Sequence, residues 1–93
     1  MENSIAKVIE VEEKGYLYIF DNLGFTKIID IRSEFYIRDL GMLCNSRPKK
    51  VFMFEEKTMI IIDNENIIKY FDIDIFEVTR ELHDFCSYNK TKI

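Results

Sequence analysis

The sequence contains one pattern twice, and this duplication constrains the fold more than any other feature. The first copy, from Val8 to Ile31, reads VIEVEEKGYLYI, then one Phe, then DNLGFTKIIDI. The second copy, from Val51 to Ile73, reads VFMFEEKTMIII and continues directly into DNENIIKYFDI. Aligned in this way, the copies are offset by 43 and then by 42 positions. The pattern predicts an internal repeat of about 42 residues.

The length of the chain limits how these repeats can be used. A chain of 93 residues can build one domain around one core. Half of it, without a metal or disulfides, is close to the size below which a fold needs outside support. We therefore expect residues 1–93 to form a single domain of two pseudo-symmetric repeats, over about 5–44 and 49–88, that share a core.

Each copy predicts three antiparallel strands joined by tight turns, which are too short for parallel crossovers. The middle strand, Tyr16 to Phe20 in one copy and Thr58 to Ile62 in the other, is apolar on both of its faces. Gly15 can supply the positive φ of the first hairpin turn, and the alignment places Thr58 opposite it. We therefore expect the two hairpin turns to differ in geometry.

A helix is expected after the third strand of each copy. Ser33 can cap the first helix and Gly41 can end it. In the second copy, Asp74 and Glu77 have the spacing of a capping pair. The apolar residues that follow recur at helical spacing as far as Cys86: Ile75, Val78, Leu82 and Phe85. The predicted fold is α+β, a tandem βββα-βββα repeat whose antiparallel sheet, six-stranded or a half-open barrel, is packed by two helices.

Composition excludes several functional classes. The net charge is −4, so no overall positive field attracts nucleic acid or an anionic membrane. Neither a signal sequence nor an apolar stretch of membrane-spanning length occurs, which predicts a cytoplasmic protein. In that compartment Cys44 and Cys86 are expected to be reduced thiols.

No catalytic motif is present, and we expect neither an enzyme nor a bound metal or cofactor. His83, the only histidine, is interpreted as an ordinary surface or boundary residue. Two acidic pairs recur in the first turn of each copy, Glu12-Glu13 and Glu55-Glu56. Because these turns lack the alternating oxygen ligands of a calcium loop, we interpret the acids as solvated turn residues.

The apolar middle strands carry the main functional expectation. Two helices cover only one face of a sheet, so the other face is expected to be covered by a partner, by a second copy in a homodimer, or by the sheet itself if it curls. This predicts a small non-enzymatic protein-binding module, regulatory or inhibitory, for example a phage or mobile-element inhibitor of a host defence complex such as an anti-CRISPR. The candidate partner-binding residues are Tyr16, Tyr18, Tyr36, Glu77, Glu81 and Asp84.

Two alternatives stay open. The basic linker between the repeats could bind nucleic acid through Arg47, Lys49 and Lys50, with binding that weakens steeply in salt. The chain could instead be a small enzyme subunit whose site is completed by oligomerisation, which would require polar groups that converge in a pocket between subunits.

Overall fold

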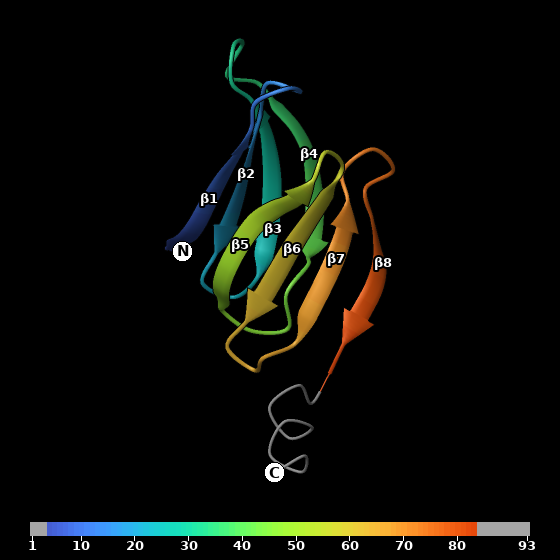
Figure 1. Cartoon of the computed structure of the whole chain (residues 1–93). Helices are drawn as coiled ribbons and strands as arrows, with labels where there is room; N and C mark the ends of the chain where they lie inside the picture. Colours follow the sequence, from blue (N-terminus) through green and yellow to red (C-terminus); the bar gives the residue numbers. More distant parts are fainter. Residues whose placement is uncertain (1–3, 84–93) are drawn as a thin grey trace, which may run out of the picture.

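A computed structural model describes residues 4–83 and contains only β-structure in that range. The eight strands are β1 (Ile5–Val11), β2 (Tyr16–Asp21), β3 (Phe25–Asp30), β4 (Tyr36–Met42), β5 (Pro48–Glu55), β6 (Thr58–Asp63), β7 (Ile68–Asp72) and β8 (Glu77–Leu82). They form two four-stranded antiparallel sheets, β1-β2-β3-β4 and β5-β6-β7-β8, in which each strand pairs with its neighbour along the chain (Figure 1). The prediction of three antiparallel strands in each copy is confirmed.

The turns between the second and third strands of each sheet show the repeat in atomic detail. The Oδ1 atom of Asp21 accepts hydrogen bonds from the backbone nitrogens two and four residues later, both at 2.9 Å. Asp63 does the same at 2.9 and 3.1 Å. The third residue after each aspartate has a positive φ, 99° at Gly24 and 64° at Asn66. Glycine and asparagine tolerate this conformation best, so the same turn forms from different sequences.

The next turns also repeat, and they replace the predicted helices. Asp30 and Asp72 each accept hydrogen bonds from the backbone nitrogens two and three residues later. Four residues after each aspartate the chain takes a positive φ, 62° at Glu34 and 58° at Phe76. The chain therefore turns back and pairs with the preceding strand.

The α+β prediction is therefore wrong: the chain forms two four-stranded sheets, and neither predicted helix exists within the described residues. The segment proposed as a helix from Ser33 to Gly41 contains all of β4 except its last residue, Met42, and the segment from Asp74 contains β8. The apolar stripe of the second helix is also wrong, since Ile75 is 56% exposed and Val78 is 38% exposed. Phe85 and Cys86 lie outside the described residues. Short apolar segments satisfy helical and strand spacing alike, and here the free edge of the preceding strand decides between them.

Strand pairing also corrects the alignment of the two copies. Ile9 pairs with Tyr18 in the first sheet, and Phe52 pairs with Ile60 in the second. The first strands are therefore offset by 43 positions and the second strands by 42. The extra residue of the first copy is Gly15, in the turn, and not Phe20 at the end of the strand.

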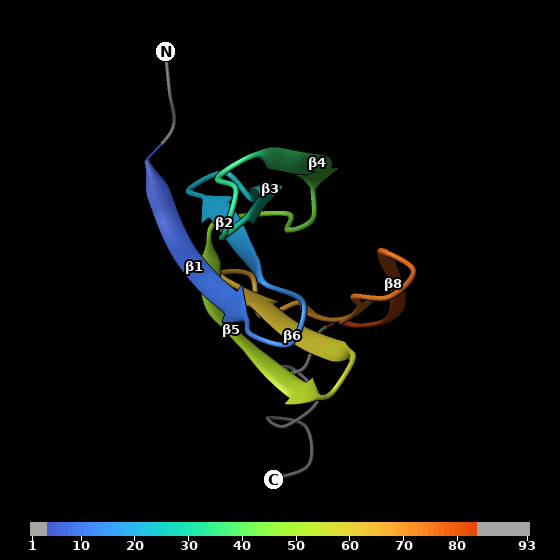
Figure 2. The ribbon, with the colours of Figure 1, turned by 90° about the horizontal axis from the view of Figure 1, so that it is seen from above.

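The core lies between the two sheets. The first sheet contributes Tyr18, Phe20 and Ile28, and the second contributes Met59, Ile61 and Phe71, all at most 1% exposed. The rings of Tyr18 and Phe71 meet edge to face, with centroids 6.1 Å apart. Strand β1 lies beside β5, whereas β4 and β8 lie apart, so the two sheets diverge from a closed edge (Figure 2).

The linker between the sheets is held by buried polar groups of the second sheet. Lys69, 9% exposed, donates hydrogen bonds to the Leu43 carbonyl oxygen at 2.6 Å and to Asn45 Oδ1 at 2.9 Å. Asp63 Oδ2 accepts one from the Asn45 backbone nitrogen at 3.2 Å. Burial raises the pKa of the neighbouring Cys44 thiol to about 11, so this thiol stays protonated at neutral pH.

Two predictions concern the whole chain but can be compared only with the described residues. Over residues 4–83 no helix is long and apolar enough to cross a membrane. The single-domain boundaries, 1–93, stay a prediction, because residues 1–3 and 84–93 lie outside the description.

Candidate binding groove

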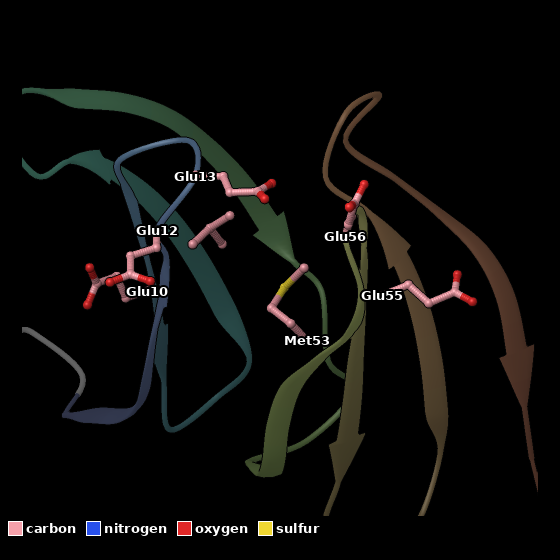
Figure 3. A pocket seen from close by; sticks show the side chains of 7 residues that line it. Glu10, Glu12, Glu13, Met53, Glu55 and Glu56 are labelled. Carbon is pink, nitrogen blue, oxygen red and sulfur yellow. The ribbon is translucent and has the colours of Figure 1, made fainter.

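An open groove of about 260 Å³ lies between the two sheets, where β1 and β5 run side by side. Its walls come from corresponding parts of the two repeats, the first strand and the turn that follows it (Figure 3). The first sheet contributes Glu10, Val11, Glu12 and Glu13, and the second contributes Met53, Glu55 and Glu56. We call this set the acidic groove.

The interior of the acidic groove is apolar, and its rim is negative. Val11 is 4% exposed and belongs to the core, and Met53 packs against that core. Figure 3 shows Met53 between the glutamates of the first sheet and those of the second. Glu13 and Glu56 flank the opening of the groove, whereas the side chains of Glu10, Glu12 and Glu55 point away from Met53 (Figure 3).

The nearby lysines pair with other acids. Lys14 Nζ contacts Asp74 Oδ1 at 2.8 Å and thereby links the β1–β2 turn to the second sheet. The hydrogen bond from Lys14 lowers the pKa of the Asp74 carboxyl group. Lys57 Nζ lies 3.9 Å from Asp72 Oδ2. In the described part of the chain, no ion pair within 4.0 Å neutralises any of the five glutamates of the groove.

The carboxylates are spread along the groove and do not surround a point. Among residues 4–83, no three carboxylate, imidazole or thiol groups come close enough to hold a metal ion. Such a distribution suits several positive charges carried on an extended ligand better than one small cation.

The residues predicted to bind a partner lie in different places. Tyr18 is fully buried, and Tyr16 is half-buried on the same strand. Tyr36 on β4 is 55% exposed, while Glu77 and Glu81 are exposed on β8. Since β4 and β8 lie apart, these side chains do not converge (Figure 2). Asp84 lies outside the described residues.

The basic residues at the start of β5 have local partners. Lys49 Nζ donates a hydrogen bond to Asn66 Oδ1 at 2.5 Å. Lys50 Nζ lies 5.3 Å from the centroid of the Phe52 ring. Arg47 is exposed in the linker. A role for these residues in nucleic-acid binding stays a prediction.

Sequence reasoning identified the acids of the groove but did not predict that they form one. Glu12-Glu13 and Glu55-Glu56 were interpreted as solvated turn residues, and Glu10 and Met53 were not considered. The available signal was that both pairs occupy the same turn of the repeat. Once the first strands of the repeats lie side by side, these turns must lie close together.

The sequence matches no protein-family model and no curated protein sequence. Its structure is similar to the WD40 β-propeller domain of Doa1, with a TM-score of 0.69 and 15% sequence identity. The match covers 86% of this chain and 27% of that chain, so this chain spans about a quarter of its neighbour's length.

This likeness concerns the fold. A β-propeller arranges four-stranded antiparallel sheets, called blades, around a central axis. The described residues form two such sheets in adjacent positions, with β1 and β5 at the closed edge. The described part of the chain, residues 4–83, is therefore all-β, and its two sheets resemble neighbouring propeller blades.

Proposed function

We propose that this chain is a non-enzymatic protein-binding module whose acidic groove takes a basic segment of a partner protein. The observation that supports this most directly is the presence of five glutamates, without ion pairs within the described residues, on the two walls of a groove whose interior is apolar. Fold alone does not define function, so the proposal depends on this groove.

The chemistry of the groove favours lysine or arginine side chains. Each has an apolar stem that can contact Met53 and Val11, and a charged head that can reach the glutamates at the rim. Complementary charge also accelerates encounter and rejects partners of the wrong sign. A phosphate backbone would be repelled at this site.

The location of the groove fits the same role. In repeat proteins the face on which the loops gather is often the binding face. Here the groove is built from the corresponding turns of two adjacent repeats. The propeller-like fold supports a protein partner in general terms, and the basic segment is our own inference.

The finer prediction of a regulatory or inhibitory role is part of this proposal. The prediction that the chain inhibits a host defence complex, for example as an anti-CRISPR, depends on size and composition alone. The acidic groove adds no argument for it. The nucleic-acid alternative is less favoured, because Lys49 and Lys50 have local partners and the net charge is negative.

The test uses a fluorescently labelled peptide of alternating lysine and leucine and measures its binding by anisotropy. Four substitutions neutralise the rim without removing volume: Glu12→Gln, Glu13→Gln, Glu55→Gln and Glu56→Gln. We expect this variant to bind the peptide at least about tenfold more weakly, since each charge contact contributes a fraction of a kcal/mol or more.

The matched control neutralises Glu77 and Glu81, two exposed acids on β8. We expect Glu77→Gln with Glu81→Gln to change peptide affinity less than twofold. If both variants lose affinity equally, the attraction depends on total charge and the groove is not the site. If the wild-type chain does not bind the peptide, the proposal is wrong.

A further inference from the structure

The two outer faces of the molecule repeat the chemistry of the two faces packed inside it. We call the outer face of the second sheet the leading face, which carries Phe52, Phe54, Ile60, Ile62 and Tyr70. We call the outer face of the first sheet the trailing face, which carries Val8, Leu17, Ile19, Ile29 and Tyr36, together with two charged residues of the same strand pairs, Glu10 and Lys27. Both follow from strand pairing, since side chains alternate across a sheet.

The leading face corresponds to the face of the first sheet that forms the core. Phe54 takes the place of Val11, and Tyr70 takes the place of Ile28. Val11 is 4% exposed, whereas Phe54 is 58% exposed. The repeat thus preserves an apolar packing face in the second sheet, and no third sheet covers it within the described residues. Of its five side chains Phe54 is exposed, Ile60 is only 6% exposed, and the other three are partly buried.

The trailing face corresponds to the face of the second sheet that forms the core. Leu17 and Ile19 take the places of Met59 and Ile61, which are buried. Val8, the counterpart of the partly buried Val51, is 52% exposed. This second outer face is also an apolar packing face without a described partner.

We propose that a second copy of this chain covers these faces, with the leading face of one copy packed on the trailing face of the next. The internal contact between the two sheets is the template for this contact between copies. Because the two faces differ, the association is head-to-tail and not a two-fold symmetric dimer. Such an interface repeats from copy to copy and closes into a ring if the rotation between copies divides a full turn.

The charged residues at the rim of the proposed interface are consistent with the head-to-tail arrangement. Inside the chain, Arg38 of the first sheet lies 4.6 Å from the ring centroid of Phe76. The repeat counterpart of Arg38 is Arg80, and that of Phe76 is Glu34. The contact between copies therefore places an arginine beside a glutamate, both exposed in the single chain.

One contact between the two sheets has no favourable equivalent between copies. The pair Lys14–Asp74 joins the two sheets, and its counterparts, Lys57 and Arg32, have the same sign. Lys57 already lies 3.9 Å from Asp72 of its own sheet, which offsets part of this repulsion.

The size of the ring follows from the structural neighbour. The aligned 86% of this chain equals 27% of the propeller-containing chain, so between three and four such lengths make up that chain. Three or four copies provide six or eight sheets, within the usual range of about four to eight blades. We therefore infer a ring of three or four copies.

The experiment measures mass by sedimentation equilibrium at micromolar concentration, under reducing conditions. We expect the wild-type chain to give three or four times 11.2 kDa. Phe54→Lys blocks the leading face and Val8→Lys blocks the trailing face, both at exposed positions, and each variant alone is expected to be monomeric. Leu23→Lys, at an apolar position 50% exposed in the β2–β3 turn, is the control and is expected to keep the wild-type mass.

Mixing the two blocked variants gives the decisive result. The Val8→Lys copy keeps its leading face and the Phe54→Lys copy keeps its trailing face, so the mixture is expected to form a one-to-one dimer and nothing larger. A symmetric dimer would be disrupted by only one of the substitutions, and the mixture would then fail to pair. A monomeric wild-type chain, or a mixture that stays monomeric, overturns the proposal.

Discussion

At the scale of the residue, the most informative side chain is Tyr18. It was predicted to bind a partner, but it is fully buried between the sheets and its ring packs against Phe71. Burial raises the pKa of its hydroxyl group well above the usual value. Its Oη atom has no hydrogen-bond partner among the described residues. A tyrosine in a strand that is apolar on both faces could not be assigned to core or surface before the second sheet was known.

Replacing Tyr18 with phenylalanine removes this hydroxyl while keeping the ring contact. A buried polar group without a partner costs about 1 to 3 kcal/mol, so Tyr18→Phe is expected to raise the free energy of unfolding by about 1 kcal/mol. Urea denaturation followed by circular dichroism measures the change. A loss of stability of similar size would show that the hydroxyl group is hydrogen-bonded in solution.

At the scale of the element, the sequence predicted six of the eight strands and misread the other two. The repeated pattern contains strand alternation and turn residues such as Asp21 and Gly24, whose roles are local. The strands β4 and β8 depend on distant information, namely pairing with the free edges of β3 and β7. The acidic groove was unpredictable for the same reason, because it exists only once β1 lies beside β5.

The aspartates of the equivalent turns differ in burial. Asp63 also accepts a hydrogen bond from the linker and is 2% exposed, whereas Asp21 is only partly buried. Asp63→Ala is expected to lower the free energy of unfolding by about 3 kcal/mol, since hydrogen bonds to charged groups contribute about 1.5 to 3 kcal/mol. Asp21→Ala, the matched control, is expected to cost less. Thermal denaturation of both variants measures the two losses of stability. A larger loss for Asp21→Ala than for Asp63→Ala would contradict this prediction.

At the scale of the whole molecule, the proposed ring brings like charges together. The acidic groove lies at the closed edge of the two sheets, so the proposed ring places the five groove glutamates of every copy near one axis, and each chain carries a net charge of −4. Apolar faces drive the association while this charge opposes it. The balance should therefore depend on salt in a defined direction.

Raising the salt concentration is expected to strengthen the assembly. The Debye length falls from about 10 Å at 0.1 M to about 3 Å at 1 M, so repulsion between acidic turns is screened while apolar packing is retained. Sedimentation equilibrium across this range should show a lower dissociation constant at high salt. The variant with glutamine at positions 12, 13, 55 and 56 should assemble more tightly at low salt and respond less to added salt. Weaker assembly of the wild-type chain at high salt would mean that ion pairs such as Arg80 with Glu34, and not the apolar faces, hold the copies together.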